Sequence, residues 1–299
     1  MFLLMTTDHA SAAAATVELP QGKLAYRAAG PAASNQPPVV LLHGLLVDAR
    51  LWAPVAERLA AEGVRSYTPT LPLGSHPWPM NADADLSPQG VARLALDFIR
   101  ALGLSDVTLA GNDTGGAIGQ IMLGADPSRI GAAVFTNCDA LGTFPPMGFA
   151  PLFRALRHPG VVACLAPGMR SKAVRNSPLA YGLLSSGRLD PDMTLDWVTP
   201  IADPAIRRDL AKLARGVHPR VLLDAASRFG QFTGPVRVLW GEADSMFRVK
   251  LGRQLSAAFP RATFTTVPGG RTFLPLDHPD RVASEIVAAA RNRQTRPAG

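Results

Sequence analysis

Residues 106–116 read DVTLAGNDTGG, and this stretch decides the fold. Residues 106–110 form a short apolar run that is typical of a strand buried on both faces of a sheet, and residues 115–123 predict a helix soon after it. The glycines at 111 and 115 lie on either side of Asp113, since a turn this tight leaves little room for side chains. The turn is expected to lift Asp113 to the end of the sheet, in front of the helix N-terminus.

Two other interpretations of this turn stay open. Asp113 could serve only as the cap of the following helix. The glycines could instead form a dinucleotide-binding loop, although a carboxylate at that position would repel a pyrophosphate. The turn alone therefore predicts a strand, a sharp corner and a helix, and leaves the role of the carboxylate undecided.

Strand-like and helix-like runs alternate on both sides of the turn. Strands are expected at 15–20, 23–28, 38–42, 64–70, 106–110, 132–137, 236–240 and 262–267, and helices at 49–62, 87–102, 115–123, 249–259 and 280–291. The stretch between 142 and 234 has helical segments broken by Pro and Gly but no clear buried strand. This pattern predicts an α/β fold, a mostly parallel doubly wound sheet with a helical lid insertion. We expect the core at 1–141 and 234–299, and the lid (cap domain) at 142–233.

Composition narrows the classes of protein. The chain has 299 residues, 47% of them hydrophobic, and no apolar run of 18 or more residues, so no membrane span is expected. The run MFLLM at 1–5 is a poor secretory signal, which favours a cytoplasmic protein. The net charge of +7 is carried by dispersed arginines, so no nucleic-acid partner is expected. The two cysteines form no metal-binding motif, and we expect neither metal nor cofactor. The oligomeric state stays open.

A second motif gives the turn its meaning. The predicted strand at 38–42 (PVVLL) ends in His43-Gly44-Leu45-Leu46, and together with the turn around Asp113 it resembles the α/β-hydrolase superfamily, from about residue 16 to residue 291. The resemblance implies that 111–115 is the nucleophile elbow and Asp113 the nucleophile. It also implies that the backbone amides of Leu45 and Thr114 form an oxyanion hole. His43 would be a structural residue of its loop.

With an aspartate at the elbow, the sequence resembles the haloalkane dehalogenase and epoxide hydrolase branch of the superfamily. A carboxylate can displace a halide or open an epoxide at a saturated carbon, which leaves an alkyl ester on Asp113. A histidine-activated water would then hydrolyse the ester, with an acid orienting the histidine. Asp244, after the strand at 236–240, is the favoured acid, and Asp139, after the strand at 132–137, is the alternative.

The sequence departs from this resemblance at the general base. Residues 268–279 read PGGRTFLPLDHP, and Thr272 stands where the family has its histidine. His278 at the entrance of the last helix is the candidate base, and His76, in a loop on the active-site side, is the alternative. Dehalogenases hold the leaving halide with side-chain N–H donors at two positions. This sequence has Thr114 and Leu45 at those positions, and their side chains offer no N–H donor. Of the lid tyrosines that protonate epoxides, only Tyr181 is present.

The predicted substrate is small and apolar. This rests on the apolar side chains expected in the lid, which are Met147, Phe149, Leu152, Phe153, Met193 and Trp197. The sequence thus favours a hydrolase with Asp113 as nucleophile. The alternative is a repurposed member without the catalytic histidine, either a ligand-binding protein or a cofactor-free lyase in which Asp113 moves a proton.

Overall fold

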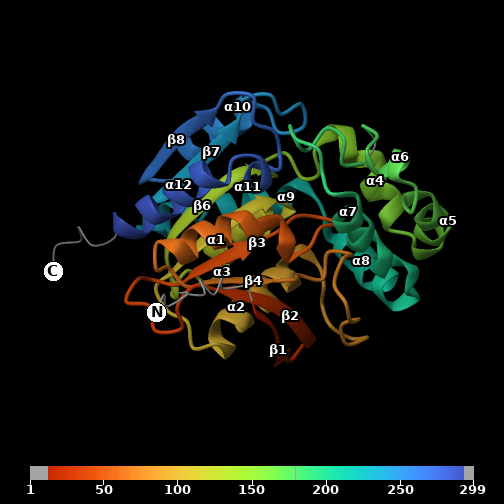
Figure 1. The fold of residues 1–299 in the computed structure, drawn as a ribbon, viewed down its shortest axis with the longest axis horizontal. Helices are drawn as coiled ribbons and strands as arrows, with labels where there is room; N and C mark the ends of the chain where they lie inside the picture. The colour runs from red at the N-terminus through yellow and green to blue at the C-terminus, as the bar shows by residue number, and fades with distance from the viewer. Residues whose placement is uncertain (1–12, 179, 293–299) are drawn as a thin grey trace, which may run out of the picture.

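A single eight-stranded sheet organises the computed structural model, which describes residues 13–178 and 180–292 (Figure 1). The strand order is β1-β2-β4-β3-β5-β6-β7-β8, with β2 antiparallel to both β1 and β4 and all other neighbours parallel. The strands are β1 (Ala13–Leu19), β2 (Gly22–Ala29), β3 (Val39–Leu42), β4 (Ser66–Pro69), β5 (Val107–Asp113), β6 (Ile130–Cys138), β7 (Val236–Gly241) and β8 (Ala262–Val267). The predicted mostly parallel α/β sheet is confirmed.

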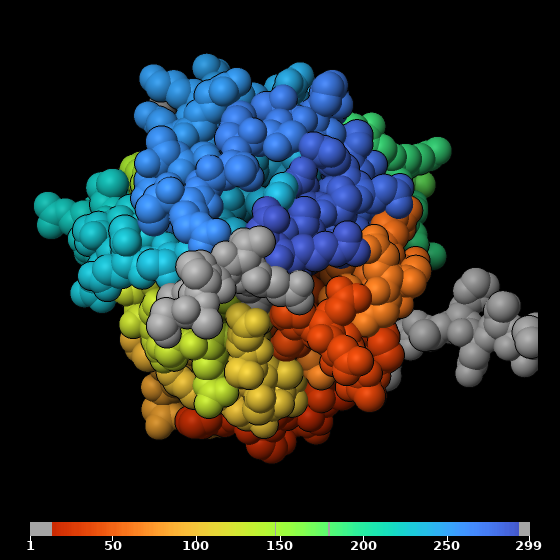
Figure 2. Space-filling model, turned by 90° about the vertical axis from the view of Figure 1, so that its left-hand side faces the viewer, coloured from red at the N-terminus to blue at the C-terminus, as the bar shows by residue number. Residues whose placement is uncertain are grey.

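The sheet is flanked by helices, which follow in the order of the chain. Those outside the stretch between β6 and β7 are α1 (Ala53–Ala61), α2 (Pro88–Ala101), α3 (Thr114–Ala125), α10 (Val249–Ala257), α11 (Leu274–Asp277) and α12 (Pro279–Arg291). Helix α1 packs against α12, whereas α2 packs against α3. Figure 2 shows α12, in dark blue, beside the orange segment that contains α1, so helices far apart in the sequence meet on this face.

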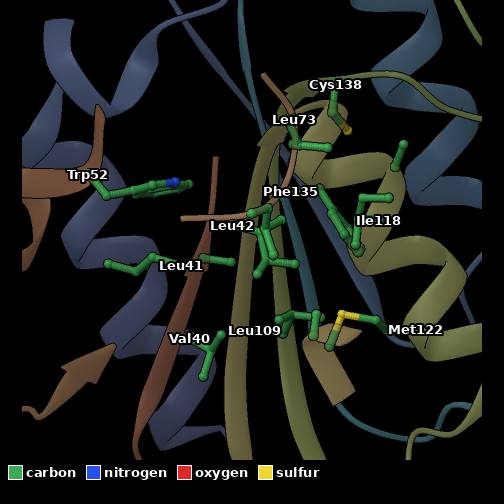
Figure 3. Close-up of a cluster of buried hydrophobic side chains, with 14 of the residues drawn as sticks. Val40, Leu41, Leu42, Trp52, Leu73, Leu109, Ile118, Met122, Phe135 and Cys138 are labelled. Atoms are coloured by element: carbon green, nitrogen blue, oxygen red, sulfur yellow. The ribbon is translucent and has the colours of Figure 1, made fainter. Parts of the chain in front are cut away.

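The central strands are buried on both faces, which explains their uninterrupted apolar runs. All four residues of β3 are fully buried, and Leu109 of β5 and Phe135 of β6 are equally inaccessible. Figure 3 shows Leu109 and Phe135 beside Ile118 and Met122 of α3, and all of these residues belong to one continuous core. Because the central strands are buried on both faces, the position of their carboxyl ends is fixed. The loops that follow these strands are therefore held in place.

Within the described residues, six α-helices lie between β6 and β7. They are α4 (Ala150–Leu156), α5 (Pro159–Met169), α6 (Lys172–Arg175), α7 (Pro191–Val198), α8 (Pro204–Gly216) and α9 (Pro219–Ala226). Figure 1 shows α4 to α8 gathered at one side of the molecule, away from the far edge strand β8. Helix α9 instead packs against α3. We call α4 to α8 with their connections the helical cover.

The strand before the elbow differs from its predicted bounds. Asp106 has a left-handed φ of 52° and precedes β5, which continues to Asp113 instead of ending at residue 110. The reason is that pairing with β6 persists to the elbow, where Asp113 lies opposite Cys138. The apolar run thus marks only the start of the strand, while the parallel neighbour determines its end.

The N-terminal run at 1–5 lies outside the described residues, as does the side chain of Met147. Within the described part of the chain, no helix has the length and apolar character that crossing a bilayer requires.

Candidate active site

The elbow is a strained corner held by close backbone packing. Asp113 has φ 53° and ψ −132°, an unfavourable conformation for a residue with a side chain. Gly115 next to it must be glycine, because a Cβ there would lie 2.3 Å from the carbonyl oxygen of Leu42. The side chain of Asp113 makes none of the hydrogen bonds that cap a helix. A strained residue that does not cap its helix is typical of a functional position.

The carboxylate of Asp113 lies against the loop that follows β3. The backbone amide of Leu45 donates a hydrogen bond to Oδ2 of Asp113 at 3.0 Å. This contact needs Gly44, since a Cβ there would lie 2.0 Å from the same oxygen. The structure therefore brings together Asp113 and Leu45, two residues that the sequence places 68 positions apart.

Burial dominates the electrostatics of this carboxylate. Loss of solvent raises the pKa of Asp113 from 3.8 to about 7, while the amides of Leu45 and Thr114 oppose the rise and the charge of Asp244 adds to it. Asp113 consequently exchanges its proton near neutral pH. A carboxyl that titrates in this range can act either as a nucleophile or in proton transfer.

Asp113 lies in the wall of an apolar cavity of about 130 Å³. Apolar cavities of comparable size accept molecules such as benzene. Most of the wall comes from the helical cover, and the strand ends contribute the rest. The lining residues are Leu45, Leu46, Asp113, Thr114, Asp139, Pro146, Phe149, Leu152, Phe153, Leu156, Val162, Leu165, Ala166, Met169, Ala180, Tyr181, Leu184 and Ile201. The lining is apolar apart from the side chains of Asp113, Thr114 and Asp139 and the hydroxyl of Tyr181.

Asp139 is a second carboxyl in the same wall. It is 1% exposed, and the hydroxyl of Thr114 reaches its Oδ2 only at 3.5 Å. Its Oδ1 is buried and has no hydrogen-bond partner among the described residues. Burial, followed by the nearby charge of Asp113, raises the pKa of Asp139 well above its usual value. Two buried carboxyls thus lie in one cavity wall, and the charge of Asp113 opposes the ionisation of Asp139.

Asp244 is buried outside the lining of the cavity and is saturated with hydrogen bonds. Its Oδ2 accepts from the hydroxyl of Thr272 and the side-chain amide of Asn137, both at 2.8 Å. Its Oδ1 accepts from the backbone amides of Met246 at 2.7 Å and Phe247 at 2.9 Å. Burial raises the pKa of Asp244 and these donors lower it. Thr272 thus occupies the place beside the acid where the resemblance puts the histidine.

The two candidate bases are not among the residues that line the cavity. His278 lies between α11 and α12, and its Nε2 is buried without a partner among the described residues. His76 is buried beside Asp209 of α8, with Nε2 3.4 Å from Oδ2. The structure therefore groups Asp113 with Leu45, Thr114 and Asp139, and it brings neither histidine to the cavity wall.

His43 has the role expected of a loop residue. Its Nε2 accepts a hydrogen bond from the backbone amide of Leu71 at 2.8 Å, and its Nδ1 lies 2.9 Å from the carbonyl of Gly44. Burial lowers the pKa of His43 to about 4, so the ring is neutral and ties two loops together.

Two asparagines that the sequence analysis missed connect the strand ends. Asn112 donates to the backbone carbonyl of Thr272 at 2.7 Å and to the hydroxyl of Thr136 at 2.9 Å. Asn137 binds Asp244 and accepts from the amide of Gly241 at 2.7 Å. The signal available in the sequence was the position of each asparagine. Asn112 lies just after the predicted strand at 106–110 and Asn137 at the end of the predicted strand at 132–137, where buried amides can bridge neighbouring loops.

One further polar group of the cavity wall, the hydroxyl of Tyr181, is already hydrogen-bonded. The hydroxyl of Tyr181 donates to the carbonyl of Leu46 at 2.5 Å, and burial raises its pKa. Among residues 13–178 and 180–292, no group of three His, Cys, Asp or Glu side chains is arranged to hold a metal ion.

Comparisons with known proteins identify relatives of this chain. A family model described as "Alpha/beta hydrolase family" matches residues 39–285. A 2-hydroxy-6-oxononadienedioate/2-hydroxy-6-oxononatrienedioate hydrolase of Dechloromonas aromatica is 28% identical over 237 residues, which is 75% of this chain and 76% of that protein. Haloalkane dehalogenase 2 of Mycobacterium tuberculosis is 26% identical over 216 residues, 66% of this chain and 68% of that one.

Solved structures extend the similarity in fold to nearly the whole chain. The haloalkane dehalogenase DbeA from Bradyrhizobium elkani superposes with a TM-score of 0.77 at 17% identity, covering 95% of this chain and 99% of that one. At this identity the match concerns the fold alone.

Proposed function

Because this chain belongs to the alpha/beta hydrolase family, we propose that it is a hydrolase in which Asp113 attacks a small apolar, epoxide-like or haloalkane-like substrate and forms a covalent alkyl ester. The observation that carries the proposal is the position of the Asp113 carboxylate. It stands at the strained elbow, has one oxygen held by the amide of Leu45, and forms part of a mostly apolar wall. A held oxygen leaves the other to attack.

The amides suit the second half of such a reaction as well. When water attacks the ester carbonyl, negative charge develops on the oxygen that Leu45 already contacts. Preorganised amides stabilise this charge without reorganising, an effect worth about 3–4 kcal/mol per donor in other enzymes. Leu45 and Thr114 are thus proposed as the oxyanion hole, and the apolar wall as the surface that selects small apolar substrates.

The proposed ester should be long-lived. Thr272 replaces the histidine and hydrogen-bonds Asp244, and a threonine hydroxyl is a poor base. Loss of a general base lowers a rate by about 10²–10⁴-fold. We propose that Asp244 supports the loop of Thr272 and that water attacks the ester slowly.

Peptide mass spectrometry tests the proposal directly. Wild-type protein is incubated with styrene oxide or benzyl bromide, quenched in acid and digested. The expected result is the mass of one alkyl group on the peptide that contains Asp113, absent in Asp113→Asn. Hydrolysis in ¹⁸O-water should then place label in the Asp113 carboxylate. An unmodified Asp113 with both reagents would overturn the proposal.

A second candidate function is favoured by one observation. The pKa of Asp113 at about 7 also suits a residue that moves a proton without forming a bond to carbon, as in a cofactor-free lyase. In that case substrate would be consumed without an adduct, and no ¹⁸O would enter the Asp113 carboxylate. The same experiment therefore separates the two candidates.

A further inference from the structure

We propose that Asp139 is the proton donor of the site, and that the substrate class is therefore small apolar epoxides. This inference rests on the proposed function, because it assumes that Asp113 is the nucleophile. It follows from which protic groups face the cavity and which of them are free to donate.

The cavity wall holds few groups that can donate a proton. Its polar side chains are those of Asp113, Thr114, Asp139 and Tyr181. The Tyr181 hydroxyl is committed to the carbonyl of Leu46, and the Thr114 hydroxyl points to Asp139 itself. Asp139 alone among these combines complete burial with an oxygen, Oδ1, that has no partner among the described residues.

The two carboxyls share one negative charge. The described lining contains no Lys, Arg or His, so no cation offsets a second charge. Asp113 ionises first, because it receives the amide of Leu45 and lies at the N-terminus of α3. Asp139 has the distant hydroxyl of Thr114 and its own backbone amide as donors, receives no amide from the loop after β3, and keeps its proton. The resting pair is a carboxylate at Asp113 and a neutral acid at Asp139.

This pair matches the chemistry of an epoxide. An oxygen of Asp113 forms a bond to an epoxide carbon while the ring C–O bond breaks. The electron pair of that bond moves to the epoxide oxygen, which takes the proton of Asp139. The products are a hydroxyalkyl ester on Asp113 and a carboxylate on Asp139. A proton donor is needed here because the leaving oxygen stays on the substrate as an alkoxide unless it is protonated.

A halide leaving group makes different demands. It requires no proton, and it is held by N–H donors, but none of the described lining side chains carries one. The wall therefore supplies what an epoxide requires and lacks what a halide requires. This favours epoxides over haloalkanes as the natural class.

Two reagents of similar size separate the role of Asp139 from that of Asp113. Styrene oxide needs a proton when it reacts, and benzyl bromide does not. In Asp139→Asn, we expect alkylation of Asp113 by styrene oxide to slow by about 10²–10⁴-fold and alkylation by benzyl bromide to stay within a few fold of wild type. Both rates come from the mass of the Asp113 peptide at timed acid quenches.

Each outcome decides a different point. Equal rates of styrene oxide alkylation in wild type and Asp139→Asn would overturn the role of Asp139 and leave Asp113 as nucleophile. Equal slowing with both reagents would also overturn it, because the variant would then have impaired Asp113 itself. If neither reagent modifies Asp113 in wild type, the proposed function fails and this inference fails with it.

A pH series on the wild type tests the same point without a variant. The titratable groups near Asp139 are the Asp113 carboxyl and the buried Cys138 thiol, Tyr181 lines the same cavity, and Asp244 acts on Asp113. Alkylation by both reagents should rise through about pH 7 as Asp113 ionises. Only the styrene oxide rate should fall again at higher pH, when Asp139 loses its proton. Parallel profiles with a shared plateau would overturn the proposal.

Discussion

Asp139 and Asp244 follow neighbouring parallel strands, and both are buried, yet their surroundings differ completely. Asp244 accepts four hydrogen bonds from two side chains and two backbone amides. Asp139 has a distant hydroxyl and its own backbone amide as donors, and its Oδ1 has no partner among the described residues. A saturated carboxyl holds its neighbours in place, whereas an unsaturated one keeps its capacity for a reacting molecule.

The same contrast explains the replacement of histidine. In the resemblance, the acid after β7 orients an imidazole, but here Asp244 binds the hydroxyl of Thr272 and two asparagines connect this loop to the elbow. The polar groups around Asp244 and Thr272 are engaged in hydrogen bonds that hold the loops together. Protic chemistry is left to the cavity wall, where Asp113 and Asp139 face an apolar space. The predictions that follow test this division.

Removing Asp244 should have the largest effect on stability. Asp244→Ala leaves the donors of Asn137, Thr272 and two backbone amides without an acceptor in the interior. We expect the free energy of unfolding to fall by about 3–5 kcal/mol, measured by urea denaturation at pH 7. The control is Asp83→Ala, at an exposed position, with an expected change below about 0.5 kcal/mol. A loss under 1 kcal/mol for Asp244→Ala would contradict a structural role.

The sequence predicted the strands that precede Asp139 and Asp244. It did not predict which of these acids lines the cavity and which one is bound by its neighbours. Parallel strands and the elbow leave a local signal, because a doubly buried strand must be apolar and a tight turn must be glycine-rich. These signals, together with the resemblance to the α/β-hydrolase superfamily, placed Asp113, Leu45, Asp139 and Asp244 directly after predicted strands. Which acid faces the cavity depends on side-chain direction after each strand, and this has no signature in a single sequence.

The histidines show the same limit. His76 and His278 were reasonable candidates because their loops were expected at the active-site edge. His76 instead packs against Asp209 of the helical cover, a contact 133 residues away in sequence. Its partner belongs to a segment with no regular pattern of strands, so the pairing could not be read from the residues around His76.

Asp113→Asn should stabilise the protein, in a pH-dependent way. The carboxyl has a pKa of about 7 in the folded chain against an ordinary 3.8, so folding takes up a proton between these values. The contribution of the neutral carboxyl is complete below pH 3.8 and is lost as the pH rises through 7. At pH 8 the variant should gain up to about 4 kcal/mol, and at pH 4 almost nothing. Urea denaturation at both pH values measures this, and an equal gain at each would contradict the assignment.

Thr272→Val should weaken the saturated site by a smaller amount. Valine matches threonine in shape but removes the hydroxyl that donates to Asp244, so one of four donors is lost. We expect about 1–2 kcal/mol of destabilisation and a further rise in the pKa of Asp244. Thr272→Ser retains the hydroxyl and is the matched control. If the serine variant loses as much stability as the valine variant, packing and not the hydrogen bond explains the effect.

Tyr181→Phe should have the smallest effect, and it tests the cavity side of the comparison. A lid tyrosine is the proton donor that the resemblance to epoxide hydrolases implies, but the hydroxyl of Tyr181 already donates to the carbonyl of Leu46. Burial also raises the pKa of the phenol, which makes it a weaker acid. We expect a loss of about 1 kcal/mol in stability and no more than a threefold change in the alkylation of Asp113 by styrene oxide. A fall of 10²-fold or more in that rate, with benzyl bromide unaffected, would transfer the role of proton donor from Asp139 to Tyr181.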